Sequence, residues 1–212
     1  MGPKAPLPGV YDDESDEDGG VDNILRNNDE LEPSTGPINS VQFHRNGQLM
    51  LAAGLDKHLR FFQIDGKRKP KIQSIFIEDC PVHKASFLPD GSEDSSYFAT
   101  GSSSGIVNVY GRDEFLAGKR KPLKTIENLM TEISQMKFNH DAPVLAISSG
   151  KERNGMRLVH VPSFAVFQNW PGPRFSLQYP RCLDFSPGSG FLSVGHAGGR
   201  VLLYKLHHYQ NA

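Results

Sequence analysis

Apolar and polar residues alternate in short runs along most of the chain after residue 37. Runs such as Ile38–Phe43 and Val201–Leu206 follow a period of two, and Gly, Asp, Asn and Pro separate one run from the next. Alternation of this kind between turn-forming residues predicts β-strands. No stretch of ten residues carries the apolar stripe of a helix. The pattern therefore predicts an all-β fold.

The predicted strands recur as a repeated unit. Each unit opens with a run ending in a phenylalanine, and the four phenylalanines, Phe43, Phe87, Phe138 and Phe185, are 44, 51 and 47 residues apart. Repeats of about 40 to 45 residues with three or four short strands are typical of WD-repeat β-propeller blades. We therefore predict about four WD-repeat blades in residues 37–212. Their expected strands are 38–43, 49–54, 59–64 and 71–77; 82–87, 97–101, 106–110 and 123–126; 133–138, 144–149, 157–161 and 165–170; and 182–185, 191–195 and 201–206.

The last predicted blade lacks a fourth strand. In closed propellers the N-terminal segment commonly supplies it, but residues 21–36 offer only Val21, Ile24 and Leu25 as large apolar candidates before Leu31. Four blades are also at the low end of the range for propellers. We therefore expect an incomplete or open propeller, whose unpaired strand edges favour self-association.

Residues 1–36 differ in composition from the rest. They contain several prolines and the acidic run Asp12–Asp18, with few large apolar residues. Such a segment cannot bury enough apolar surface to offset chain entropy, so we predict a disordered acidic tail. The start, Met1–Pro6, lacks the apolar stretch of a secretory signal, and no apolar run approaches the ~20 residues of a membrane span. We therefore expect an intracellular protein with no membrane partner.

No pattern in the chain predicts catalysis or a cofactor. Two cysteines, Cys80 and Cys182, are too few for a disulfide framework or a four-thiolate metal site. The histidines lack metal-ligand spacing, so we expect no metal and no other cofactor. Gly101–Gly105 matches the hydrolase nucleophile motif by letter, but a strand is predicted directly after it, whereas the motif requires a helix. We assign no catalytic residue and expect neither an enzyme nor a small-molecule substrate.

Two basic clusters are candidate contacts for RNA phosphates or a nuclear-import receptor. The net charge is −1, so attraction to nucleic acid must come from local patches. Each cluster follows a predicted third strand, so repeat symmetry places both on one face of the propeller. Ordinary solvated loops are the alternative; phosphate positioning is favoured over base reading, because no aromatic residues are interleaved. The candidate residues are Lys67, Arg68, Lys69, Lys71, Lys119, Arg120, Lys121 and Lys124.

Trp170 is the only tryptophan. Two roles fit its position at the end of the last predicted strand of the third blade. It caps the edge of a blade, or it is an exposed anchor for a protein partner, because tryptophan is enriched among the residues that dominate interfaces.

Four segments of the chain are more specific than a general WD pattern: Gly36–Gly47, Ala53–Arg68, Tyr179–Gly190 and Leu203–Ala212. Together they resemble the family of WD-repeat proteins associated with the U3 small nucleolar RNA, subunits of the small-subunit processome. The resemblance covers roughly residues 36–212. It implies a non-catalytic scaffold in the nucleus, within the nucleolus, that serves small-subunit ribosomal RNA processing in ribosome biogenesis.

The same resemblance implies partners. They are other processome WD-repeat proteins and, through the complex, U3 small nucleolar RNA or pre-ribosomal RNA. A different class of function also fits the blades: a generic WD-repeat adaptor that presents protein substrates, for example to a ubiquitin ligase.

The sequence departs from the family in its second unit. Leu88–Gly91, typical of an early blade, runs almost directly into Tyr97–Ser102, typical of a late one. We interpret Ser92–Ser96 as the seam of an internal deletion that removed central blades. Because the seam lies between a first and a second strand, the joined copy is predicted to form a hybrid blade.

Overall fold

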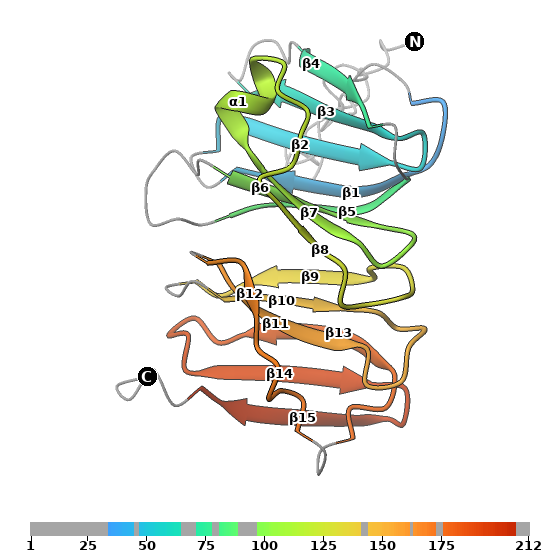
Figure 1. The fold of residues 1–212 in the computed structure, drawn as a ribbon, viewed down its shortest axis with the longest axis vertical. Coiled ribbons are helices and arrows are strands. Elements are labelled where there is room, and N and C mark those ends of the chain that lie inside the picture. The colour runs from blue at the N-terminus through green and yellow to red at the C-terminus, as the bar shows by residue number, and fades with distance from the viewer. Residues whose placement is uncertain are drawn as a thin grey trace, which may run out of the picture. The chain divides into compact units, whose positions relative to one another are not determined.

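The computed structural model describes residues 34–44, 47–64, 71–77, 81–88, 97–140, 144–161, 163–172 and 176–206. By its contacts the chain divides into Met1–Glu30 and Leu31–Ala212, and every described residue belongs to the second unit. The described residues of this unit are all-β apart from one short helix, as the sequence predicted (Figure 1). Most of the predicted tail, residues 1–33, lies outside the described residues.

Four antiparallel sheets follow one another along the chain, and we call them blades 1 to 4 (Figure 1). Blade 1 contains β1 (Ile38–Phe43), β2 (Leu49–Gly54), β3 (His58–Gln63) and β4 (Lys71–Phe76). Blade 2 contains β5 (Val82–Phe87), β6 (Tyr97–Ser102), β7 (Val107–Gly111) and β8 (Lys124–Ile126). Blade 3 contains β9 (Gln135–Phe138), β10 (Val144–Ser148), β11 (Met156–His160) and β12 (Ala165–Val166). Blade 4 contains β13 (Pro180–Phe185), β14 (Phe191–His196) and β15 (Arg200–Lys205).

The predicted strands agree with the structure to within two residues at each end, with one exception. A strand was predicted for 165–170, but β12 ends at Val166. The backbone N–H of Phe167 still donates to the carbonyl of Leu158 at 2.9 Å, and the chain then turns. The last part of this prediction was therefore wrong, because the chain leaves blade 3 before Trp170.

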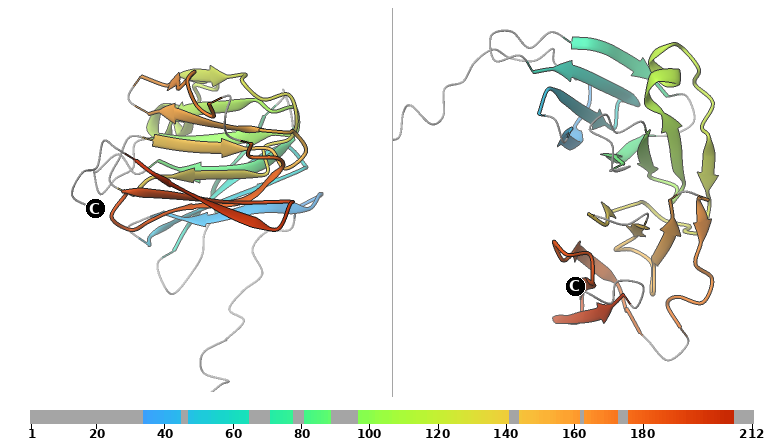
Figure 2. Two further views of the ribbon diagram at one scale, coloured as in Figure 1. Left: turned by 90° about the horizontal axis from the view of Figure 1, so that it is seen from below. Right: turned by 90° about the vertical axis from the view of Figure 1, so that its left-hand side faces the viewer.

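Consecutive blades pack face to face, in chain order. Close contacts join β1 and β2 to β5, β5 to β9, and β9 to β13. Figure 2 shows the same succession from two other sides. Within the described residues, no contact of comparable extent joins blade 1 to blade 4, and β15 has no fourth strand beside it. The four blades therefore do not form a closed ring in this part of the chain, as the sequence indicated.

The core consists of apolar layers between neighbouring blades. Side chains alternate between the two faces of each strand, so a strand between two blades contributes to both layers. Between blades 1 and 2 the layer is aromatic: the Phe98 ring lies 5.6 Å from Phe61, 5.2 Å from Tyr110 and 5.0 Å from Phe115, measured between centroids. Burial of each such side chain stabilises the fold by roughly 1.5–3 kcal/mol.

The helix α1 (Arg112–Leu116) was not predicted from the sequence. It follows β7 directly and carries Asp113 and Glu114 in its first turn. Acidic side chains at this end of a helix stabilise it by their interaction with the helix dipole. It places Phe115, which is fully buried, in the aromatic layer. Its five residues are too few to show a helical stripe, so only the tertiary contact of Phe115 reveals its role.

Blade 2 is one continuous sheet across the predicted seam. Residues 89–96, which include Ser92–Ser96, lie outside the described residues. On either side of them β5 and β6 pair antiparallel, with a register shift between Val82 and Lys84. Blade 1 shows the same shift, between Ile38 and Ser40. The predicted hybrid blade therefore forms a regular ladder.

Candidate interaction surfaces

The basic loop after α1 lies on the surface, and part of it is held by the helix. The Lys119 ammonium donates to the Glu114 carboxylate at 3.2 Å. The Arg120 guanidinium lies 4.9 Å from the Phe115 ring centroid and donates to the Phe115 carbonyl at 2.6 Å. Lys121 and Lys124 are exposed, and no ion pair is found for them within the described residues. These two lysines are the ones best placed to meet an anionic partner.

Most of the basic cluster from Lys67 to Lys71 lies outside the described residues. Lys67, Arg68 and Lys69 lie outside the described residues, and only the backbone of Lys71 is placed, at the start of β4, opposite Phe62. That the two clusters share one face of the propeller therefore stays a prediction.

Trp170 lies between blades 3 and 4 and is half-buried. Its ring meets the ring of Tyr204 on β15 edge-on, with centroids 5.6 Å apart. It also packs against the apolar layer that includes Leu158 of blade 3 and Leu192 of blade 4. Trp170 thus covers the third strand of blade 4, and its role as a protein anchor stays a prediction.

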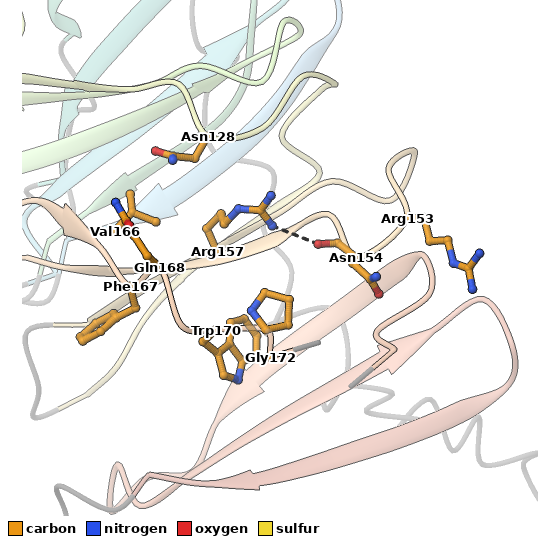
Figure 3. Close-up of a pocket in the computed structure, with 10 residues that line it drawn as sticks. Asn128, Arg153, Asn154, Arg157, Val166, Phe167, Gln168, Trp170 and Gly172 are labelled. Carbon is orange, nitrogen blue, oxygen red and sulfur yellow. Dashed lines mark hydrogen bonds between the residues drawn. The ribbon is translucent and has the colours of Figure 1, made fainter. Parts of the chain in front are cut away.

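A cavity of about 440 Å³ opens beside Trp170 (Figure 3). Arg157 enters it from β11 and donates to the carbonyls of Asn154, at 3.1 Å, and Met156, at 2.7 Å. Two guanidinium groups, two aromatic rings and several amides line it, and among the described residues no carboxylate does. Such a lining suits a small anionic or planar group. Its residues are Asn128, Arg153, Asn154, Arg157, Val166, Phe167, Gln168, Trp170, Pro171 and Gly172.

Sequence reasoning missed the arginines of this cavity. Arg153 lies in a turn and Arg157 lies on a strand, where each has the pattern of an ordinary polar position. Only the packing of β11 beside the segment after β12 brings them to the same cavity as Trp170 (Figure 3). The one available signal was Arg157 itself, an arginine within an apolar run.

A second cavity, of about 500 Å³, lies along the innermost strands of blades 1 to 3. Lys84, Lys137 and His140 line it together with Val41 and Phe43 of β1. The Lys137 ammonium also reaches the Asp184 carboxylate of blade 4, at 3.5 Å. This surface is therefore both apolar and basic, and the sequence alone did not single it out.

A buried ion pair holds the turn between β2 and β3. The Asp56 carboxylate accepts hydrogen bonds from the Arg60 guanidinium, from the Ser34 hydroxyl at 2.6 Å and from the His58 backbone at 3.2 Å. The bond from Arg60 is the main reason that the pKa of Asp56 lies well below its usual range. Both charged side chains are buried, so the pair is structural, and it ties Ser34 to blade 1.

The hydrolase-like motif has the geometry of a blade turn. Ser103 is exposed in the turn between β6 and β7, and a strand follows where a nucleophile elbow requires a helix. The Ser102 hydroxyl accepts the backbone N–H groups of Ser104, at 3.3 Å, and Ile106, at 3.0 Å. The serines of this motif therefore shape the turn.

Two kinds of feature are absent from the described part of the chain. There, no group of three or more His, Cys, Asp or Glu side chains gathers in a way that could hold a metal ion. Among the same residues, no helix has the length and apolar character needed to cross a membrane.

Comparison with known proteins agrees with this architecture. A family model described as WD domain, G-beta repeat, matches residues 27–63, which include β1 to β3. The chain is 37% identical to the U3 small nucleolar RNA-associated protein 18 homologue of Arabidopsis thaliana, over 95% of the chain and 64% of the relative. Identity is 38% to the probable U3 small nucleolar RNA-associated protein 18 of Schizosaccharomyces pombe, over 82% of the chain and 33% of the relative. It is 26% to the human homologue, over 84% and 55%.

The chain spans less than two thirds of the length of these relatives. The plant and human alignments extend over 351 and 307 positions, more than the 212 residues of the chain. Those relatives therefore contain residues, inside the aligned region, that the chain lacks, as the interpretation of an internal deletion requires. With its four blades and these identities, the chain is similar to the U3 small nucleolar RNA-associated protein 18 homologues of these organisms.

Proposed function

We propose that the chain is a non-catalytic scaffold subunit of a nucleolar U3 ribonucleoprotein assembly that processes the small-subunit ribosomal RNA precursor. The observation that carries this proposal is the similarity to U3 small nucleolar RNA-associated proteins from a plant, a fungus and an animal, which extends over most of the chain. The nucleolus is the location that this role requires.

The surfaces left free by blade packing support a role in docking. The sheet faces between blades are filled by apolar side chains, so partners must meet turns, loops and cavities. Other WD-repeat subunits of the processome are the protein partners we propose, with Trp170 and its cavity as one contact. U3 or pre-ribosomal RNA would be met through phosphates, at Lys121 and Lys124 and at the cluster from Lys67 to Lys71.

Affinity purification of the tagged full chain from nuclear extract, with sequencing of the recovered RNA and identification of the proteins, tests the proposed role. We expect enrichment of U3 RNA and of processome WD-repeat proteins over an unrelated tagged propeller. Recovery of cullin-type ligase subunits without U3 RNA would overturn the proposal in favour of a substrate adaptor.

The phosphate contacts have a separate test. Charge reversal at Lys121 should weaken RNA association and lower the slope of log affinity against log salt by about one unit per lost contact. Arg181→Glu is the matched control, because Arg181 is an exposed cation on β13 of blade 4, outside both basic clusters. An equal change in slope for both variants, or none for Lys121→Glu, would exclude a phosphate contact at Lys121.

A further inference from the structure

Each blade has two faces that play different parts in the succession. We call the face toward the preceding blade the leading face and the face toward the following blade the trailing face. In blade 2 the leading face carries Phe87 and Phe98, which pack in the layer with blade 1. The trailing face carries Val107 and Val109, which pack in the layer with blade 3.

Strand register identifies the equivalent positions in every blade. Phe43 pairs with Met50 as Phe87 pairs with Phe98 and Phe185 with Leu192, so these phenylalanines occupy one position of the leading face. The orientation of the side chains on β1 leads to the same assignment. The side chain of Gln42, the residue before Phe43, points toward blade 2 and accepts a hydrogen bond from the Phe87 backbone N–H at 2.8 Å. Successive side chains of a strand point to opposite faces. Phe43 therefore points away from blade 2.

The leading face of blade 1 exposes positions that blades 2 and 4 bury; the equivalent Phe138 of blade 3 is half-buried. Phe43 is 60% exposed, whereas Phe87 and Phe185 are each 4% exposed. Val41, two residues before Phe43 on the same face of β1, is 56% exposed, and Phe76 on β4 is 51% exposed. Met50 and Phe62 in the middle of this face are buried, so the exposed apolar surface lies along its inner and outer strands.

The trailing face of blade 4 shows the same anomaly at the other end of the series. Leu203 pairs with Ser193 as Val109 pairs with Ala99 and Phe61 with Leu51, which makes the three residues equivalent. Leu203 is 67% exposed, and Val109 and Phe61 are fully buried. Val201, the equivalent of Val107 and Leu59, is 74% exposed where they are fully buried.

The side chains of these two end faces also match in size. On the trailing face of blade 2 the second strand carries two small residues, Ala99 and Gly101. Ala99 lies in one apolar layer with Leu145 and Ile147 of the next leading face, and Gly101 lies against Ile133. Blade 4 continues this with Ser193 and Gly195 on β14. Blade 1 offers large side chains in return. The chain thus carries both halves of one blade interface, at opposite ends of its series (Figure 2).

We propose that a second copy of the chain completes this interface. The trailing face of blade 4 in each copy packs on the leading face of blade 1 in the other, and the two contacts close a ring of eight blades. A contact between different surfaces gives a closed ring when its rotation closes, and eight blades lie within the range that propellers use. The proposal is independent of the proposed function.

The test measures the mass of the chain in solution and asks whether two variants that are monomeric alone form a dimer when mixed. Sedimentation of the full chain at micromolar concentration should give twice the chain mass of 23.5 kDa. Phe43→Asp alone and Leu203→Asp alone should each sediment as monomers, with unchanged circular dichroism because both side chains are exposed. Mixing the two variants should restore a dimer, because one interface then has Phe43 and Leu203 intact. Met130→Asp, at an exposed apolar side chain outside both faces, should remain dimeric like the parent chain.

Each other outcome overturns the proposal in a recognisable way. A monomer for the parent chain would mean that the chain's own N-terminal segment covers blade 1. A dimer broken only by Leu203→Asp, without complementation, would mean that the β15 edges pair with each other. Polymers in place of dimers would mean that the contact forms but the ring does not close.

Discussion

The turns between the second and third strands of blades 1 and 2 adopt similar backbones with different chemistry. Both place a residue in the left-handed region, Lys57 with φ 62° and Gly105 with φ 86°. In blade 1 the buried Asp56–Arg60 pair holds the turn, and in blade 2 the neutral hydroxyl of Ser102 holds it. A side chain at Gly105 would lie against the carbonyl of Leu129, whereas Lys57 is only half-buried. The neighbouring segment, more than the turn itself, decides which residues fit.

The largest expected effect comes from breaking the charged turn. Arg60→Met leaves the Asp56 carboxylate buried without its cation, which should cost about 3–5 kcal/mol of unfolding free energy. Urea denaturation measures the loss. Adding Asp56→Asn to this variant removes the unpaired charge and should recover part of the stability. No difference between the single and the double variant would contradict the assigned role of the pair.

A smaller loss is expected at the glycine of the neutral turn. Gly105→Ala combines a left-handed backbone with a clash against the Leu129 carbonyl, so we expect a loss of about 2–3 kcal/mol. Gly199→Ala is the matched control in blade 4, with φ 71° and open space around the added carbon. It should lose only about 1 kcal/mol. If both variants lost the same unfolding free energy in urea denaturation, the left-handed backbone alone, and not the contact with Leu129, would account for the loss.

Removal of the hydroxyl in blade 2 should cost less again. Ser102→Ala leaves two backbone N–H groups without their acceptor, and a net loss of about 1 kcal/mol is typical of such bonds. Ser103→Ala, one residue along and exposed, should leave the denaturation midpoint unchanged. A shift for the control as large as that for Ser102→Ala would mean that the hydroxyl does not hold the turn.

The smallest effect is the pH dependence that separates the two turns. The folded pKa of Asp56 is lowered, so its pairing stabilises the fold above the unfolded value of about 3.9 and is lost as pH falls toward the folded value. The difference in unfolding free energy between the parent chain and Asp56→Asn should therefore shrink from pH 5 to pH 3. The difference between the parent chain and Ser102→Ala should stay constant over that range, since no charge is involved.

Most strands could be predicted because successive side chains point to opposite faces of a strand and turn residues separate one strand from the next. In Ile38–Phe43 the polar Ser40 and Gln42 alternate with the apolar Val41 and Phe43, and turn residues such as Gly105 mark where each strand stops. The sequence could not predict α1, because a helix of five residues has no periodicity and depends on the buried Phe115. Nor could it predict the early end of β12, where Trp170 leaves its blade to pack on Tyr204.

The candidate sites were less predictable than the strands. Basic residues such as Lys121 were visible as a cluster, but the guanidinium of Arg120 is partly occupied by Phe115, which only the structure shows. The cavity beside Trp170 depends on the spacing between β11 and the segment after β12. Such contacts between elements leave no periodic signal in either one.

Every strand pair in the four sheets joins neighbours in the sequence, and this has a consequence for folding kinetics. Hairpins close short loops, so a blade can form its ladder at a small entropic cost, without waiting for the others. The slow events are then the collisions of whole blades, whose contacts link residues about one repeat apart. Loss of whole blades leaves the hairpins of the remaining blades unchanged. The strand ladders of these blades can therefore form at the same rate as in a longer propeller.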